Sequence, residues 1–355
     1  MLNFKIISYS LIKILILINI SFAQNQSPAN TAGPNCHIIN SSLSNNYGKS
    51  YKISSNNLLQ SASVPDAVNF KSRNLLYYVN GDFDNHSIHV AELDKNGRNL
   101  KKIGPITLNG EIIKDAVDPD LIVTKDGRLR LFYYVGLFTK PVTYPKPNKF
   151  YSAISDDGVN FKIEGVIATL DNATDPSVTI LNDKTYLLAI AQPEMYKIVF
   201  FISNDGYNFR QISELKGGIP ELSNNNNGEP ELIFQESSGF TLYLSKDNGM
   251  NWQRIKKNIL SDSPVGVASP SILKISNNQR QMYYVTIKKD CSTPPTAYLE
   301  DKGALNNMQE MGPPPLGHGV DPVKNKNMQE MGPPPLGHGV NPAKNKKKKK
   351  WLNQN

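Results

Sequence analysis

The chain has 355 residues, of which 39% are hydrophobic and 9% aromatic, and its formal net charge is +8. Most of that charge lies at the two ends: residues 303–355 hold eight lysines against three acidic residues, and residues 1–23 hold two lysines and no acid. The remaining +1 on residues 24–302 excludes the basic surface that nucleic-acid binding requires, so we expect no nucleic-acid partner.

Residues 1–23 have the features of a secretory signal. Two lysines accompany a short apolar stretch, Ile14–Ile20, and Ser21–Ala23 is a small-x-small cleavage site. The apolar stretch is too short to cross a membrane. A buried N-terminal strand is the alternative, which the polar segment Gln24–Asn35 disfavours. We therefore expect an exported protein, either periplasmic or secreted.

Five extended segments of the chain open on a proline that has polar neighbours. These prolines are Pro65, Pro119, Pro176, Pro220 and Pro270, spaced 54, 57, 44 and 50 residues apart. A period near 50 residues, in a chain of short β-branched and aromatic strands, indicates one four-stranded unit repeated around a ring. We predict an all-β fold, a five-bladed β-propeller of four-stranded antiparallel blades, over residues 24–302.

The third unit shows the expected order of strands most clearly. Its predicted strands are Ser177–Asn182, Lys184–Gln192, Lys197–Ser203 and Phe209–Ile212. In the fourth unit, Pro220 and Pro230 both resemble the start of an inner strand. We favour Pro220, because Pro230 lies too close to the turn at Asp247 for three strands to fit between them. Glu231–Glu236 is then the second strand.

The fifth unit is short of strands at its C-terminal end. It offers Ser271–Ile275 and Gln281–Lys288, with Thr296–Leu299 as a candidate third strand. We expect residues 37–60 to supply the missing strand, because a blade built from both ends of the chain closes the ring and removes free sheet edges. This closure brings Cys36 near Cys291. In an exported protein the pair is expected to form a disulfide, with two free thiols as the alternative.

Proline suits the start of an inner strand, which is an edge strand, because no ladder partner needs its missing N–H. It also favours extended backbone at the preceding residue, so we expect Asp118 and Asp175 to be extended and fixed at the channel mouth. A simple turn at each Asp-Pro pair is the alternative. If the ring closes, acidic side chains converge on its axis. The candidate catalytic residues are Asp66, Asp118, Asp120, Asp175 and Glu221, with Glu229 and Glu231 as outsiders.

Three turns between third and fourth strands share a serine, an aspartate, a glycine and an aromatic residue in fixed order. They are Ser155, Asp157, Gly158 and Phe161; Ser203, Asp205, Gly206 and Phe209; and Ser245, Asp247, Gly249 and Trp252. The last matches S-x-D-x-G-x-x-W and resembles the Asp-box of sialidase-type repeats. We expect the carboxylate to bind turn amides and the glycine to take a positive φ, so these residues are structural.

The stretch AVDPDLIVTKDGRLRLFYYVG (116–136) resembles the Asp-Pro strand, Asp-Gly turn and aromatic strand of five-bladed glycoside hydrolases, especially family 43. The likeness in pattern extends over residues 65–300. It implies a glycoside hydrolase in which three carboxylates from separate blades act as base, pKa-setting group and acid.

Carried onto this sequence, the resemblance implies Asp66 as the base, Asp175 as the pKa-setting group and Glu221 as the acid. Asp118 and Asp120 compete with Asp175, and Glu229 replaces Glu221 if the register of the fourth unit differs. Asp66 departs from the pattern because it follows its proline instead of preceding it. Since side chains alternate along a strand, this shift could aim Asp66 away from the channel.

Residues 303–355 are predicted to be a disordered tail, because triple proline with glycine cannot build a packed core. Residues 307–326 recur at 327–346, and a lysine run, Lys346–Lys350, follows. The tail is either solvated or in contact with an anionic surface. We expect a monomer that hydrolyses carbohydrate without a cofactor. A calcium ion bound in the channel is the alternative to the absence of a cofactor. The alternative is a non-catalytic propeller that binds glycan or protein through its channel face.

Overall fold

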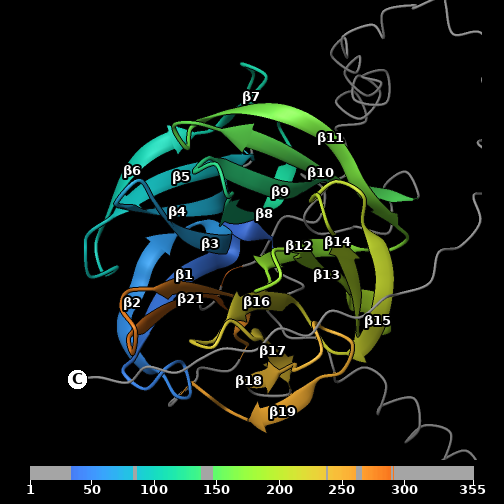
Figure 1. Cartoon of the computed structure of the whole chain (residues 1–355). Coiled ribbons are helices and arrows are strands. Elements are labelled where there is room, and N and C mark those ends of the chain that lie inside the picture. Colours follow the sequence, from blue (N-terminus) through green and yellow to red (C-terminus); the bar gives the residue numbers. More distant parts are fainter. Residues whose placement is uncertain are drawn as a thin grey trace, which may run out of the picture. The chain divides into compact units, whose positions relative to one another are not determined.

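The computed structural model describes residues 33–82, 86–136, 147–236, 239–260, 266–288 and 291. They form five sheets arranged as sectors around a common centre (Figure 1). The predicted five-bladed propeller is thus confirmed. The expected signal segment 1–23, the tail 303–355 and the candidate strand Thr296–Leu299 lie outside the described residues. Within the described ranges, no helix is long and apolar enough to span a membrane.

Each blade is a meander that runs from an inner strand near the centre to an outer strand. The first blade holds β3 (Ala62–Phe70), β4 (Arg73–Asn80), β5 (Ile88–Leu93) and β6 (Leu100–Pro105). The second holds β8 (Ala116–Val123), β9 (Leu129–Val135), β10 (Asn148–Ser155) and β11 (Asn160–Leu170). A two-residue strand, β7 (Thr107–Leu108), pairs in parallel with β11 and widens the second blade to five strands.

The remaining blades repeat this order. The third holds β12 (Thr174–Ile180), β13 (Tyr186–Gln192), β14 (Lys197–Ser203) and β15 (Arg210–Lys216). The fourth holds β16 (Pro220–Asn224), β17 (Pro230–Glu236), β18 (Gly239–Leu244) and β19 (Gln253–Lys256), which confirms Pro220 as the start of its inner strand. The fifth holds β20 (Ala268–Lys274), β21 (Arg280–Ile287), β1 (His37–Ser44) and β2 (Lys52–Gln60). Two short 3-10 helices, η2 (Pro34–Cys36) and η5 (Pro193–Met195), complete the described elements.

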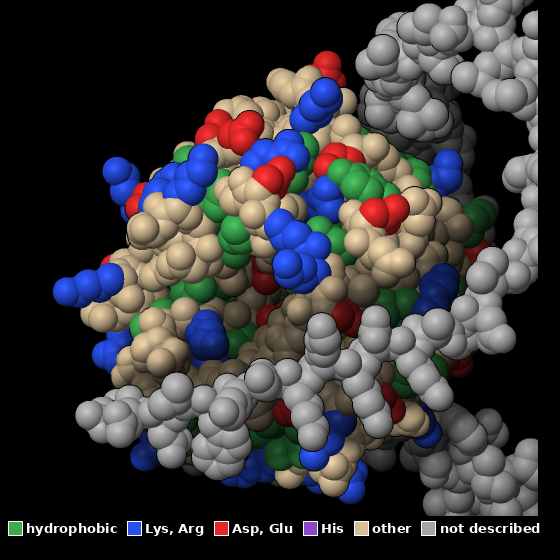
Figure 2. Space-filling view, in the orientation of Figure 1, with side chains coloured by type: hydrophobic (Ala, Val, Ile, Leu, Met, Phe, Trp, Pro, Cys, Tyr) green, Lys and Arg blue, Asp and Glu red, His purple; other side chains and the backbone are tan. Residues whose placement is uncertain are grey.

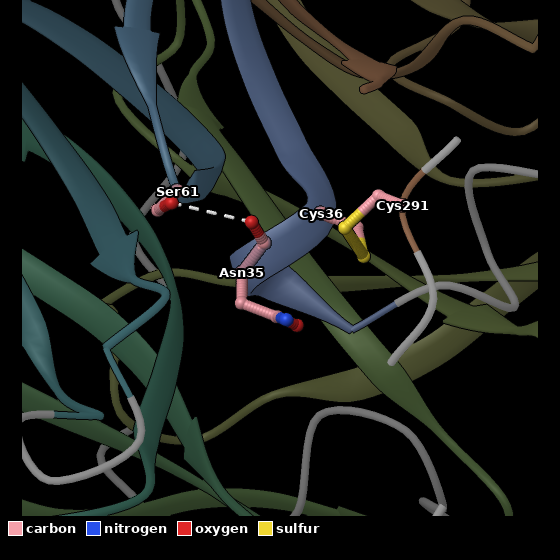
Figure 3. Close-up of a disulfide and its surroundings, with 4 residues drawn as sticks. All are labelled: Asn35, Cys36, Ser61 and Cys291. Carbon is pink, nitrogen blue, oxygen red and sulfur yellow. Dashed lines mark hydrogen bonds between the residues drawn. A yellow bond between two sulfur atoms is a disulfide. The ribbon is translucent and has the colours of Figure 1, made fainter. Parts of the chain in front are cut away.

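The fifth blade closes the ring with strands from both ends of the chain, as predicted. Its closing contact is the antiparallel ladder between β1 and β21. The N-terminal segment contributes two strands instead of one, because β1 occupies the third position and β2 the fourth. Cys36 and Cys291 form a disulfide across a sequence separation of 255, with their Cα atoms 5.5 Å apart (Figure 3). The same segment is tied to the link between the fifth and first blades, where the hydroxyl of Ser61, between β2 and β3, donates to the Asn35 carbonyl (Figure 3).

Neighbouring blades pack through apolar side chains on their facing sides. The cluster between the second and third blades includes Phe132 and Phe150 on one side and Leu188 and Val199 on the other, all buried. Every residue of β13 is buried, as expected for a strand covered on both faces. These packed walls position the inner strands against one another.

Four of the five inner strands carry a β-bulge at the residue before the proline. Val64, Asp118, Asp175 and Ser269 have φ between +42° and +53°, and the register between inner and second strand slips at each of them. The extended backbone predicted for Asp118 and Asp175 is therefore wrong. A bulge leaves one extra residue unpaired and turns the strand, so pairing across the sheet overrides the local preference before proline.

The three Ser-Asp-Gly turns make the bonds expected of structural residues. In each, the serine hydroxyl accepts from the glycine amide, at 2.9 Å for Gly158, 3.0 Å for Gly206 and 2.9 Å for Gly249. Asp205 Oδ1 accepts from the amides of Tyr207 and Asn208 at 2.8 and 2.9 Å, and Asp157 binds its turn in the same way. The three glycines have φ of +80°, +78° and +88°. These carboxylates are engaged by their own turns at the outer strands, away from the inner strands.

Candidate active site in the channel

One residue from each inner strand takes part in a closed ring of hydrogen bonds. It is the residue after the proline, and its side chain accepts from a backbone amide of the next inner strand. The five bonds run from Leu121 N to Asp66 Oδ2 (2.8 Å), Val178 N to Asp120 Oδ1 (2.9 Å), Leu222 N to Ser177 Oγ (2.8 Å), Ile272 N to Glu221 Oε1 (2.8 Å) and Ala67 N to Ser271 Oγ (2.9 Å). They link each blade to the next and the fifth back to the first. We call these five residues the axial ring.

Three axial-ring positions are acidic, and their carboxylates converge. Asp66, Asp120 and Glu221 each offer an oxygen atom, and these atoms lie within 4.8 Å of one another. All three residues are buried, with 5–6% of their surface exposed. In the view of Figure 2, acidic side chains are visible in a recess near the middle of this face. The position of Asp66 after its proline does not separate it from the other acids, because Asp120 and Glu221 also follow theirs.

The two serines of the axial ring hold the carboxylates from the other side. Ser271 Oγ donates to Asp66 Oδ1 at 3.0 Å, and Ser177 Oγ donates to Asp120 Oδ2 at 3.0 Å. Asp66 and Asp120 thus each bind one amide and one hydroxyl. Glu221 has its amide bond and only a longer approach of 3.5 Å to Ser177.

Asp118 and Asp175 form a second, separate pair. Both precede their prolines, on the second and third blades, and the Asp175 amide donates to Asp118 Oδ2 at 3.1 Å. Thr174 Oγ1 donates to Asp175 Oδ2 at 2.6 Å. The five candidate acids therefore divide into the trio of the axial ring and this pair.

Burial raises the pKa of all five carboxyl groups. The pKa of Asp66 rises to about 7, where bonds from Ser271 and Leu121 moderate the rise, and that of Asp175 rises to about 6. Burial, and then the charge of Asp66, raise the pKa values of Asp120 and Glu221 well above their usual range. Burial and the charge of Asp175 do the same for Asp118. An ionised Asp66 therefore favours the protonated forms of Asp120 and Glu221.

The two outsiders do not belong to the axial ring. Glu231 pairs with the buried guanidinium of Arg280, and Glu229 Oε2 accepts from Asn225 Nδ2 at 2.7 Å. Since β16 starts at Pro220, the fourth blade presents Glu221 to the ring. This placement removes the reason for substituting Glu229 as the acid.

Two buried histidine pairs were missed by the sequence analysis. His37 Nδ1 lies 2.6 Å from Ser63 Oγ, and His86 Nδ1 lies 2.8 Å from Asp115 Oδ1. Their members are 26 and 29 residues apart and lie on different segments. No local motif marks such pairs, so only the folded arrangement reveals them.

The donor set of the trio fits a hard cation. Carboxylate oxygens are the ligands that Ca²⁺ prefers, and Asp66, Asp120 and Glu221 are the described residues that could hold a channel calcium. One oxygen of each group already accepts a hydrogen bond from a backbone amide. The other oxygen of Asp66 and that of Asp120 accept serine hydroxyls, so a cation would share these oxygens with the hydrogen bonds.

No protein-family model matches the sequence, and no curated protein matches it significantly. Among solved structures, it is similar to a protein of unknown function from Dyadobacter fermentans (11% identity, 68% of this chain and 82% of that one, TM-score 0.48). It is also similar to an α-L-arabinofuranosidase from Clostridium thermocellum (16% identity, 61% and 80%, TM-score 0.47). A third is a glycoside hydrolase family 43 enzyme from Xanthomonas citri complexed with xylotriose (13% identity, 64% and 87%, TM-score 0.44). A function for this chain has to be argued from its own site.

Proposed function

We propose that this protein is a carbohydrate-active propeller that hydrolyses glycosidic bonds with the acids of its axial ring. The observation that carries the proposal is the convergence of Asp66, Asp120 and Glu221 from three separate blades. Burial raises the pKa of all three groups, and the charge of Asp66 raises those of Asp120 and Glu221 further. Neighbouring carboxyl groups of which one stays protonated while another ionises are the requirement for acid and base catalysis at one centre.

In this proposal Glu221 is the acid, and Asp66, for which the resemblance implies the role of base, is the nucleophile. Oxygen atoms of the two groups lie within 4.8 Å of each other, which fits the short separation of retaining enzymes and not the wider one that a base-activated water needs. Glu221 gives its proton to the glycosidic oxygen as the bond to the anomeric carbon breaks, and Asp66 forms a bond to that carbon. Glu221 then takes a proton from the water that displaces Asp66, so that both groups return to their starting state. Asp120 replaces Asp175 as the pKa-setting group, because burial, then the charge of Asp66 and then that of Asp120 raise the pKa of Glu221. Asp175 acts instead on Asp118.

The test is release of reducing sugar from arabinan, xylan and aryl glycosides by the wild type and by Glu221→Gln. The glutamine keeps an oxygen for the Ile272 amide but has no proton to give, so we expect a loss of roughly 100-fold or more in kcat. Glu229→Gln is the matched control from the same blade, and it should keep activity within about twofold, since Glu229 lies outside the axial ring. Absence of turnover by the wild type on the whole panel would reject hydrolysis.

A specific observation favours a second candidate, a non-catalytic propeller that binds glycan. Ser177 and Ser271 fill axial-ring positions and accept the same kind of amide bond as the acids do. An acid at such a position therefore has a structural role without any chemistry. Saturable binding on a glycan array, with no turnover and no effect of Glu221→Gln on binding, would select this candidate.

We also propose that the protein is exported and monomeric, with its tail in contact with an anionic surface. Support for export comes from the disulfide, which oxidising compartments maintain. Mass spectrometry of the mature protein should find an N-terminus after Ala23. Deletion of residues 303–355 should release the protein from anionic membranes at low salt, and unchanged partitioning would contradict the tail contact.

A further inference from the structure

A second candidate binding site lies at the outer edge between the second and third blades. A cavity of about 460 Å³ is bounded by β11 of one blade and by the β14–β15 turn of the next, both on the outer side of the ring (Figure 1). Its lining includes Val166, Ile167, Asn204, Tyr207, Asn208 and Arg210. This volume lies within the range of small-ligand sites, which combine an apolar wall with a few polar groups.

Tyr207 forms a fixed aromatic platform in this cavity. Its hydroxyl donates to Glu164 Oε1 at 2.7 Å and accepts from Arg130 Nη2 at 2.5 Å. The Arg130 guanidinium carbon lies 4.4 Å from the centre of the Tyr207 ring. The ring is thus held from below by a buried ion pair, while 42% of the residue stays exposed. An exposed but immobile ring binds a ligand with little loss of side-chain entropy.

The turn that carries Tyr207 does not require an aromatic residue at this position. The equivalent residues after the turn glycine are Val159 in the second blade and Met250 in the fourth. All three turns keep the bond from the glycine amide to the serine hydroxyl. The turn itself therefore does not require the ring of Tyr207, which serves contacts outside the turn.

Hydrogen-bonding groups flank the platform. Asn204 and Arg210 are exposed, and their side chains make no hydrogen bond to any other residue within the described ranges. An amide offers both donors and an acceptor, and a guanidinium offers a fork of donors. A sugar ring presents the matching surface, with apolar C–H groups on its face and hydroxyls around its rim.

We propose that this cavity is a carbohydrate-binding site, in which a sugar residue of a polysaccharide stacks on Tyr207 and hydrogen-bonds to Asn204 and Arg210. The site lies on β11, β14 and β15, whereas the converging acids lie on the inner strands β3, β8 and β16, and it needs no catalysis. It would hold a polymer on the outside of the ring. Binding at this site therefore does not depend on hydrolysis in the channel, and the two can be tested separately.

Native gels cast with arabinan, xylan or polygalacturonate test this site. The protein is run with Glu221→Gln in the background, so that turnover cannot degrade the matrix. We expect retardation of this parent protein in at least one gel. For Tyr207→Ala and for Arg210→Ala, the dissociation constant should be at least about tenfold larger. Met250→Ala is the matched control, since Met250 is exposed at the same turn position, and it should be retarded like the parent.

Tyr207→Phe and a thermal scan guard against a folding artefact. The phenylalanine keeps the ring and loses only the hydroxyl bonds, so it should retain most of the retardation. If Tyr207→Ala fails to fold, Arg210→Ala decides, because Arg210 is exposed on an edge strand. Absence of retardation in every gel, or equal retardation of the parent, Tyr207→Ala and Arg210→Ala, would overturn the proposal. Loss of hydrolysis with intact retardation would reject only the channel chemistry.

Discussion

We predict that the propeller is more stable near pH 5 than near pH 8. Burial raises the pKa of Asp66 to about 7 and that of Asp175 to about 6, whereas both groups ionise near pH 4 in an unfolded chain. The folded protein therefore holds protons that the unfolded chain releases. The contribution of these two groups to the free energy of unfolding is fully present below about pH 4, and it is lost as the pH rises through their folded-state pKa values.

The expected fall is large. A pKa raised by about three pH units in the folded state corresponds to roughly 4 kcal/mol for Asp66, and one raised by about two corresponds to roughly 3 kcal/mol for Asp175. The part of this fall that lies between about pH 5 and pH 8 is roughly 3 kcal/mol for Asp66 and roughly 1 kcal/mol for Asp175. Burial also raises the pKa values of Asp118, Asp120 and Glu221, so these groups change stability in the same direction. Because domains are stable by only about 5–15 kcal/mol, such a change is readily measured.

The assay is urea unfolding followed by the fluorescence of Trp252, which packs on Phe200 in the third blade with ring centres 5.0 Å apart. The measurement runs from about pH 5 to about pH 8 with EDTA, so that no cation neutralises the acids. Asp66→Asn keeps an oxygen for the Leu121 amide and cannot ionise, so it should remove roughly half of the pH dependence. A stability that is constant or rises over this range, or an unchanged slope in the variant, would refute the reasoning.

Three further predictions concern the architecture. Reduction of the Cys36–Cys291 disulfide, which closes a loop of 255 residues, should lower the free energy of unfolding by about 5 kcal/mol; an unchanged thermal midpoint with reductant would contradict this. Gly206→Ala should destabilise by roughly 1–3 kcal/mol more than Gly110→Ala in urea unfolding. Both glycines have positive φ, but only at Gly206 would a Cβ meet a guanidinium nitrogen at 2.5 Å, so equal effects would argue against this packing. Ser271→Ala removes a donor from Asp66 and should raise the pKa of Asp66 further, seen as an upward shift of the pH at which stability falls; a downward shift would be inconsistent with the bond.

The sequence was sufficient to predict the blades because their signals are local. Recurring prolines, short aromatic strands and Ser-Asp-Gly turns each reflect contacts within one blade. The strand that pairs with β21 was harder to predict. This strand, β1, has the sequence HIINSSLS, which is too polar to be recognised as a central strand, yet it is largely buried. Its serines are satisfied across strands, as in the bond between Ser41 and Ser54, and such partners are invisible in a local pattern.

The candidate site was predicted in composition but not in arrangement. All five acids are buried around the inner strands, but the sequence pattern grouped Asp66 and Glu221 with Asp175, and it left Asp120 only as a competitor of Asp175. The bonds that define the axial ring join residues of different blades that lie 45 or more positions apart in the sequence, such as Leu222 and Ser177. A signal was nevertheless present, since the residue after each proline is Asp, Asp, Ser, Glu or Ser, and all of these carry an acceptor oxygen.

A position that accepts either serine or an acid allows structure and chemistry to be separated. Asp120→Ser places at the second blade the side chain that Ser177 and Ser271 supply elsewhere, so the bond to the Val178 amide can form again. The variant no longer buries a carboxyl group with a raised pKa, and its free energy of unfolding near pH 8 should rise. If Asp120 serves the channel chemistry, the same variant should lose hydrolysis or glycan binding, because functional groups are often kept against stability. A variant that gains stability and keeps full activity would show that Asp120 only links the blades. A variant that loses stability near pH 8 would show that the Asp120 carboxylate is stabilised by a partner outside the axial ring.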